Sequence, residues 1–333
     1  MGLFGNLFRN TSKDGEFLRL CARGTLKEVH EALNSWAYAG AKNKDGQTAL
    51  MSASINPDAN IVKLVIAELK KQNINIINAP NNMGMTALHV AAAYNNNPEV
   101  IRILAEAGAN FNARDNSGHT PLMTAVSTVI NDLANSAYRD NTALVKALIG
   151  CGKKRGCGID TRDGNGYTAL HWLAMSGVNP AMIRVLVEGG ADLEAKDAKG
   201  GTPIFCAVIN PSTVMLKALI DAGADTDCND NDGISVLIYA IISLANGHTT
   251  LNHIKLLIDN MSYFDNFDIN GATAMIYAAQ LVDYPEVVKM LIDAGADLTE
   301  EDFDGHTALD WAIHVHNSAA VSMLSARGAR RNL

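Results

Sequence analysis

The sequence contains few aromatic residues and no hydrophobic run long enough to cross a membrane. Aromatic side chains make up 6% of the 333 residues, although 48% of the residues are hydrophobic. Most of the apolar content is therefore aliphatic, which suits thin layers of packed helices better than one thick core. Apolar content this high excludes a disordered chain and predicts a globular protein.

Basic residues are also scarce, because the formal net charge is −8 at pH 7. No basic stripe is present, and the composition therefore predicts that the chain does not bind nucleic acid. The one dense basic run, Lys153-Lys154-Arg155, is expected in a Gly-rich loop. An acidic surface instead favours a basic protein partner.

Cysteine is limited to five residues, and none lies in a C-x-x-C pair, so neither a disulfide framework nor a zinc site is indicated. This usage fits a reducing compartment. No secretory signal or membrane span is found, which predicts a cytoplasmic protein. Residues 1–16 are expected to form an N-terminal tail.

A tripeptide Gly-x-Thr/Ser, followed by Ala, Pro or Val and then an apolar residue, recurs along the chain. Its copies begin at Gly46, Gly84, Gly118, Gly166, Gly200, Gly233, Gly271 and Gly305. Subtracting neighbouring positions gives spacings of 38, 34, 48, 34, 33, 38 and 34 residues. The basic unit is therefore about 33 residues, with three enlarged copies.

The fullest copies, Thr86–Ala92 and Thr168–Ala174, resemble the T-P-L-H-x-A signature of the ankyrin-repeat family. The resemblance extends from Phe17 to Ala329. It implies an all-α repeat solenoid, an ankyrin-repeat stack of helix pairs with short β-hairpin fingers. We expect residues 17–333 to form a single ankyrin-repeat domain of about nine helix pairs, with an enlarged third full repeat at 118–165.

Each element of the repeat has a physical reason. Thr caps the first helix, and a Gly that can adopt the left-handed conformation ends the second helix, at Gly108, Gly190, Gly223 and Gly295. An Asp or Asn always stands three residues before the motif Gly, where its side chain can bond backbone amides in a tight turn. These hinge residues are Asn43, Asn81, Asp115, Asp163, Asp197, Asp230, Asp268 and Asp302.

The third copy is 15 residues longer than the basic period, taking 48 minus 33. About four of the added residues are expected to lengthen the finger at 152–158, which holds the basic run. The rest lie between the two helices, where Tyr138 and Arg139 are conspicuous. Insertions in repeat arrays often map to binding loops, so we expect this enlargement to be functional.

Several residues could carry chemistry. His89 and His171 occupy the motif His, and the resemblance implies that these side chains bond the backbone between neighbouring repeats. A metal site at His306, His314 and His316 has poor geometry, and no base is positioned to activate Cys151 or Cys157. We therefore expect no catalytic residue, no metal and no cofactor.

The resemblance implies that a partner binds at the finger tips and on the exposed flank of the first helices. Carried over by position, these residues are Met83, Met85, Tyr94, His119, Tyr167, Met175, Phe303, His306 and His314. A further column follows the motif His and contains Trp172, Cys206, Tyr239, Tyr277 and Trp311. These side chains either line the binding groove or pack between repeats. Trp172, the basic run and the third-repeat loop complete the predicted surface.

The sequence therefore predicts a monomeric, non-catalytic scaffold or adaptor that grips a protein partner through its finger tips and concave surface. Two narrower versions of this binding function are an immunity-type inhibitor that blocks an enzyme or toxin, and a secreted, host-directed effector. A structural spacer would have no high-affinity partner. The competing class is an enzyme that uses a cysteine or a metal site.

Overall fold

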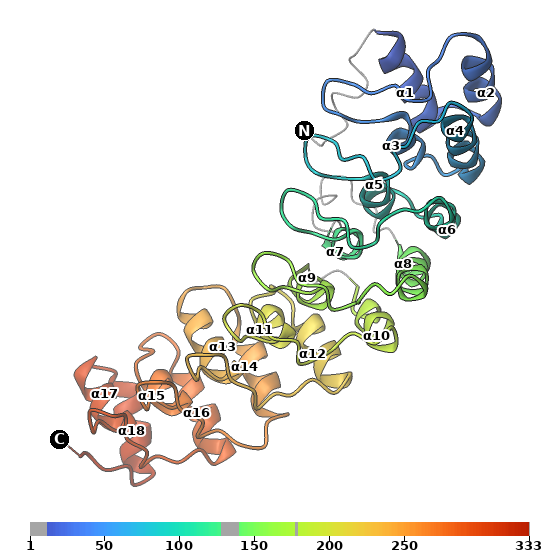
Figure 1. Cartoon of the computed structure of the whole chain (residues 1–333). Coiled ribbons are helices and arrows are strands. Elements are labelled where there is room, and N and C mark those ends of the chain that lie inside the picture. The colour runs from blue at the N-terminus through green and yellow to red at the C-terminus, as the bar shows by residue number, and fades with distance from the viewer. Residues whose placement is uncertain (1–11, 128–139, 177–178, 333) are drawn as a thin grey trace. The chain divides into compact units, whose positions relative to one another are not determined.

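The computed structural model describes residues 12–127, 140–176 and 179–332. Eighteen helices lie within these ranges and follow one another as nine consecutive pairs (Figure 1). The pairs are α1 (Lys13–Arg23) with α2 (Leu26–Ser35), α3 (Ala49–Ala53) with α4 (Ala59–Lys71), α5 (Ala87–Tyr94) with α6 (Pro98–Glu106), α7 (Pro121–Ser127) with α8 (Thr142–Lys154), α9 (Ala169–Ser176) with α10 (Ala181–Glu188), α11 (Pro203–Val208) with α12 (Thr213–Asp221), α13 (Val236–Ala245) with α14 (Leu251–Ile258), α15 (Ala274–Ala279) with α16 (Pro285–Ala294), and α17 (Ala308–His314) with α18 (Ser318–Ala326).

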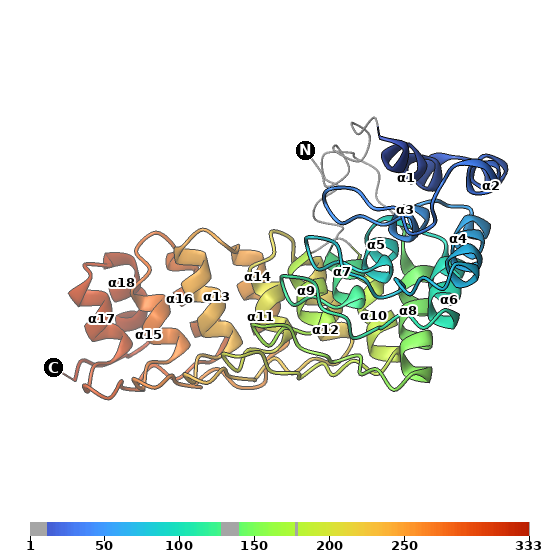
Figure 2. The same ribbon diagram turned by 45° about the horizontal axis from the view of Figure 1, so that its top comes forward.

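The chain divides into two compact units. Unit 1 comprises residues 1–164 with 188–191, and unit 2 comprises residues 165–187 with 192–333. In unit 1, the first helices α1, α3, α5 and α7 pack in succession, and the second helices α2, α4, α6 and α8 form another layer. In unit 2, the first helices run from α9 to α17 and the second helices from α12 to α18 in the same way (Figure 2). The predicted all-α repeat stack is confirmed.

The repeated motif builds the start of each first helix and its buried face. In α3, the Thr48 hydroxyl accepts a hydrogen bond from the Met51 amide at 3.2 Å and so caps the helix. The apolar residue two positions after the motif Thr or Ser is completely buried in many copies, including Leu50, Leu88, Leu170 and Leu237. These aliphatic side chains supply the layered core that the composition indicates.

The second helices end as the sequence predicts. Gly108, Gly190, Gly223 and Gly295 have φ values of 93°, 88°, 95° and 92°. A side chain would strain this left-handed backbone, so glycine suits the position.

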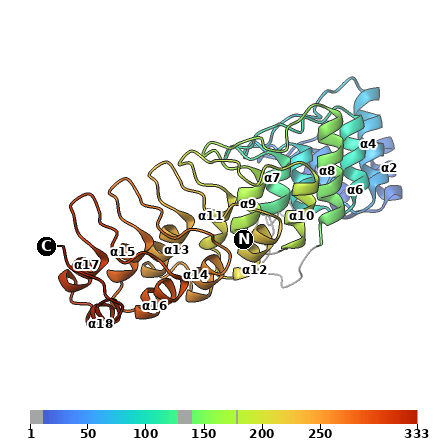
Figure 3. The same ribbon diagram turned by 90° about the horizontal axis from the view of Figure 1, so that it is seen from below.

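Each finger is a tight turn organised by its hinge residue. In unit 2, Oδ1 of Asp268 accepts from the backbone amides of Asn270 and Ala272, both at 2.9 Å. The same pair of hydrogen bonds forms at Asn43, Asn81, Asp115, Asp197, Asp230 and Asp302. The hinge prediction is confirmed at these seven positions. Figure 3 shows the fingers before α13, α15 and α17 on one side of their helices.

The fingers contain less β-structure than expected. Among the described residues no strand forms, and four fingers are closed by one isolated antiparallel bridge each, for example Phe267 with Thr273. The hinge carboxylate or amide bonds amides inside the turn, which leaves few backbone groups to extend a ladder.

Two expected boundaries are wrong. Helix α1 begins at Lys13, inside the expected tail, because Ser12 caps it by accepting from the Gly15 amide at 3.1 Å. Lys153 and Lys154 do not lie in a loop, since α8 ends at Lys154 and Arg155 is its C-cap. Cationic side chains in the last turn of a helix interact favourably with its dipole, which supports this longer helix. Tyr138 and Arg139 lie outside the described residues.

Candidate functional site

The motif histidines link neighbouring repeats inside each unit. His89 is completely buried, and its Nε2 lies 3.0 Å from the carbonyl oxygen of His119 in the next finger. Its Nδ1 accepts from the Thr86 amide at 3.2 Å, and burial lowers the pKa of the imidazole. His171 is held in the same way, with Nε2 3.2 Å from the carbonyl oxygen of Gly201. The role implied by the resemblance is confirmed, and both rings are committed to the fold.

A second set of buried links was not predicted. Asn95 lies in the turn between α5 and α6, and its Nδ2 donates to the carbonyl oxygens of Ser54 and Asn56 at 2.9 and 2.8 Å. Asn56, Asn210 and Asn317 bond the preceding pair in the same way, whereas Asn141 donates to the carbonyl oxygen of Ala125 in α7 of its own pair. The available signal was an Asn 10 to 12 residues after the motif Gly, taking 56 minus 46, 95 minus 84 and 317 minus 305.

The predicted tip residues of unit 1 separate into exposed and buried side chains. Met83 is 45% exposed at the tip of its finger, whereas Met85 is buried with 6% exposure. Met85 follows the turn glycine, and its carbonyl oxygen accepts from the Asn81 amide in the closing arm of the hairpin. The prediction that Met85 is exposed to a partner is therefore wrong. His119 is half-buried, with Nδ1 3.8 Å from Asp115.

The predicted helix-flank residues lie at the ends of their helices. Tyr94 is the last residue of α5, and it borders an open hollow of about 380 Å³ together with Ile55 and Pro57. Met175 and His314 occupy similar places near the ends of α9 and α17. An eight-residue helix is about 12 Å long. Each of these side chains is thus separated from the finger of its own repeat by about the length of the first helix.

The last finger of unit 2 brings predicted residues together around Trp311. The ring of Trp311 lies 5.5 Å from that of His306 and 5.7 Å from that of His314. No group of three His, Cys, Asp or Glu side chains suited to a metal ion was found among the described residues. Phe303, at the tip of the same finger, is 71% exposed.

The column after the motif His packs against the repeats. Cys206 is buried, and Trp172, Tyr239, Tyr277 and Trp311 are partly buried. The Tyr277 hydroxyl donates to Oδ2 of Asp268 at 2.8 Å, and burial together with this carboxylate raises the pKa of Tyr277 to about 12. Tyr167 stacks on His171, with ring centroids 5.4 Å apart, and meets Trp172 edge-on. These contacts favour packing, the second of the two alternatives, at Tyr277 and Trp172.

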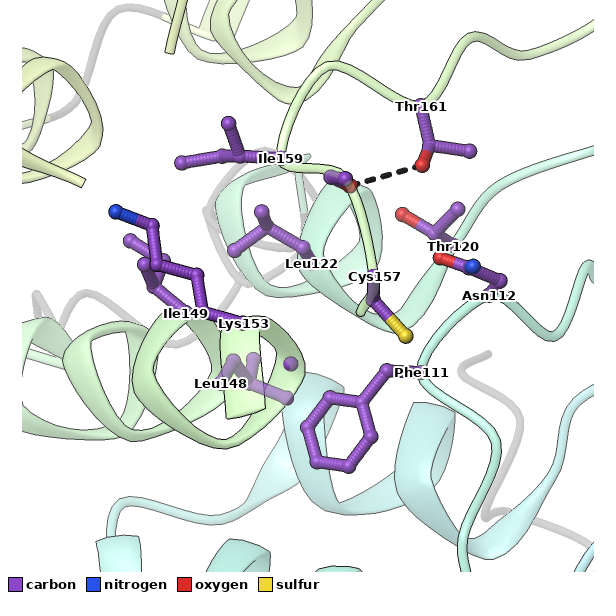
Figure 4. A pocket seen from close by; sticks show the side chains of 12 residues that line it. Phe111, Asn112, Thr120, Leu122, Leu148, Ile149, Lys153, Cys157, Ile159 and Thr161 are labelled. Atoms are coloured by element: carbon purple, nitrogen blue, oxygen red, sulfur yellow. Dashed lines mark hydrogen bonds between the residues drawn. The ribbon is translucent and has the colours of Figure 1, made fainter. Parts of the chain in front are cut away.

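The basic run lies beside a small cavity in unit 1 (Figure 4). Phe111, Leu148 and Cys157 line this cavity, whose volume is about 30 Å³. Such a space holds a water molecule but no organic substrate. The Arg155 guanidinium donates to the carbonyl oxygen of Ala105 and therefore fastens the end of α8 to α6. Lys153 and Lys154 are exposed.

The other cysteines are poorly suited to nucleophilic chemistry. Burial raises the pKa of Cys21, and it raises the pKa of Cys206 to about 12 and that of Cys228 to about 11. These side chains are therefore protonated thiols at neutral pH, whereas the thiolate is the nucleophile.

Comparison with known proteins identifies the repeat. A family model described as ankyrin repeats in three copies matches residues 18–115, 71–136, 133–227 and 210–302. The B-cell lymphoma 3 protein homolog of Mus musculus is 30% identical over 177 residues, which are 53% of this chain and 36% of that protein. The neurogenic locus notch homolog protein 1 of Homo sapiens is 28% identical over 223 residues, 58% of this chain and 9% of that protein. The chain therefore aligns with only a part of each relative.

One solved structure supports the same assignment. The crystal structure of the ankyrin repeat domain of Bcl-3, described as a unique member of the IkappaB protein family, matches with a TM-score of 0.54. The sequence identity is 26%, and the match covers 64% of this chain and 88% of that chain. A search of the described helices found none long and apolar enough to span a membrane.

Proposed function

The chain belongs to the ankyrin-repeat family, and from this premise we propose that it is a non-catalytic module that binds a protein partner through its finger tips and the ends of its first helices. Ankyrin-repeat domains typically mediate protein–protein interaction and are usually non-catalytic. The partner would meet side chains such as Met83 in unit 1 and His306 in unit 2. An acidic chain of this kind is suited to a basic protein and repels nucleic acid.

One observation carries the proposal. The polar groups of the repeat bond within the fold: the motif histidines bond the next finger, the hinge residues bond their own turn, and the buried Asn residues bond the preceding pair. Large apolar side chains are meanwhile exposed at finger tips, where Met83 and Phe303 are 45% and 71% exposed. Exposed Met and aromatic side chains supply contact area at modest entropic cost, which is what an interface needs.

Site-specific photo-crosslinking tests the proposal. A benzophenone amino acid would replace Met83 or His306 in the full chain, and the control positions would be Lys63 of α4 and Lys217 of α12, both exposed on second helices. We expect a discrete protein adduct from the finger positions and none from the control positions. Adducts from the second helices alone, or from no position, would contradict the proposal.

A further inference from the structure

Two neighbouring fingers of unit 2 carry an exposed cluster of apolar side chains. Phe303 and Ile269 are 71% and 63% exposed, the largest values among the large hydrophobic side chains of the described residues. Phe267 is 54% exposed, and its ring meets that of Phe303 edge-on with centroids 6.1 Å apart. These three residues, called the apolar tip patch below, lie on the fingers that precede α15 and α17 (Figure 3).

The register of the fingers shows that Ile269 and Phe303 replace a residue whose side chain links neighbouring fingers. Both residues directly follow the hinge, a position that holds Asn in three other fingers. The Asn side-chain amides donate to carbonyl oxygens of the preceding finger, from Asn82 to Lys44 at 3.1 Å, from Asn116 to Asn82 at 2.9 Å and from Asn231 to Ala198 at 3.5 Å.

Ile269 and Phe303 retain only the backbone part of this linkage. Their amides donate to the carbonyl oxygens of Asp232 and Asn270 at 3.0 and 2.9 Å. The apolar side chains cannot form the hydrogen bond made by Asn, and they remain largely in water. A large apolar group left in water contributes little to folding stability, so its contribution is expected in binding.

The fingers around the patch are strongly acidic. The segments 224–235, 261–272 and 295–306 contain no Lys or Arg and eleven acidic residues, counted as four, two and five. In earlier fingers the residue before the hinge is basic in four cases, at Lys42, Arg114, Arg162 and Lys196. In these three fingers that position holds Asn229, Phe267 and Glu301. Arg330 and Arg331 lie near Thr307 and Asp310 of the last repeat, but the eleven acidic residues outnumber them, so the local potential is negative and attracts cationic groups.

We propose that the apolar tip patch docks an extended, basic polypeptide segment of a partner protein. An apolar side chain of that segment contacts the rings of Phe267 and Phe303, while its Lys and Arg side chains pair with carboxylates such as Asp304 and Glu300. The proposal rests on the proposed function and adds the place and the chemistry of recognition. The same carboxylates repel nucleic acid and anionic lipid surfaces.

An arrayed set of 12-residue peptides, varied in net charge and apolar content, tests the proposal with the full chain. We expect binding by peptides that combine several Lys or Arg residues with a Leu or Phe, and weaker binding at higher salt. The double variant Ile269→Asn, Phe303→Asn places Asn directly after the hinge, as in three other fingers. It should weaken the binding of these peptides by about tenfold or more. Replacing Glu300, Glu301 and Asp304 by their amides should abolish the preference for basic peptides.

Matched controls lie on the same unit. Val282 and Asp283 are exposed in the loop after α15, and Val282→Asn and Asp283→Asn should leave peptide binding unchanged. Binding that is independent of peptide charge, or equal binding by the Ile269→Asn, Phe303→Asn variant, would overturn the proposal. If a partner still crosslinks at Met83 in that variant, the proposed function is retained and only the docking proposal is contradicted. Absence of crosslinking at every finger position in the wild-type chain would instead contradict both the docking proposal and the proposed function.

Discussion

Nε1 of Trp311 donates a hydrogen bond of 2.7 Å to Oδ2 of Asp302, while Oδ1 of the same carboxylate accepts from the amides that close the finger turn. One carboxylate therefore fixes both the turn and the side chain on the helix behind it. Burial acts to raise the pKa of Asp302, but the hydrogen bonds from the His306 amide and from Trp311 outweigh it and lower the pKa.

Replacing Trp311 by Phe should lower the free energy of unfolding by about 1–3 kcal/mol, because a hydrogen bond to a charged acceptor is lost while a ring remains. Urea unfolding of the full chain measures the change. Tyr277→Phe, which removes the corresponding bond to Asp268, should act in the same direction. An unchanged unfolding midpoint in both variants would show that the indole and phenol contribute only as packed rings.

Asp310 makes the last repeat of unit 2 sensitive to acid. It stands where earlier copies have the motif His, and it accepts from the Asn332 amide at 3.1 Å and from Nε of Arg331 at 3.2 Å. Burial acts to raise the pKa of Asp310, yet these bonds and those from Thr307 lower it from 3.8 to about 2. A lowered pKa in the folded state stabilises the protein above pH 3.8, and this contribution is lost as the pH falls towards 2.

The stability difference between the wild-type chain and Asp310→Asn should therefore shrink by about 1 kcal/mol between pH 5 and pH 3. Urea unfolding at pH 5, 4 and 3 measures the difference. Asp283→Asn is the control, since Asp283 is exposed. The difference in unfolding free energy between the wild-type chain and this variant should not change with pH. A difference for Asp310→Asn that does not change with pH would contradict the assigned hydrogen bonds.

Asn95 should contribute more to stability than its neighbour Asn96. Asn95→Ala leaves the carbonyl oxygens of Ser54 and Asn56 without their buried donor and should cost about 1–3 kcal/mol. Asn96 is exposed, and Asn96→Ala should change the unfolding free energy by less than about 0.5 kcal/mol. Chemical unfolding of the two variants provides the comparison. An equal loss of unfolding free energy in both would contradict the stabilising role of the Asn95 hydrogen bonds.

The local parts of the fold were predictable from the sequence because they depend on short-range hydrogen bonds. The cap at Thr48, the left-handed Gly295 and the turn at Asp268 each follow from a residue and its near neighbours in the chain. A period near 33 residues then implies that such units stack. These predictions needed no knowledge of which side chain faces which neighbour.

Contacts between repeats were harder to predict. Met83 and Met85 flank the same glycine, yet only the closed hairpin shows that one is exposed and the other buried. The bonds of Asn95 and Arg155 reach carbonyl oxygens 39 to 50 residues away in the sequence. The basic run was placed in a Gly-rich loop because the third copy is longer than the basic period, whereas the added residues extend α8 through Lys154.

The most direct test of the account is the dissociation constant of the crosslinked partner, measured by titration calorimetry with the full chain. Met83→Ser and His306→Ala should each weaken binding by about tenfold or more, and Met83→Ser should do so without lowering the unfolding midpoint. Lys63→Ala and Lys217→Ala, on the second helices, should change the constant less than about twofold, as expected outside a binding surface. Weaker binding by the second-helix variants, with unchanged binding by the finger variants, would contradict recognition through the finger tips.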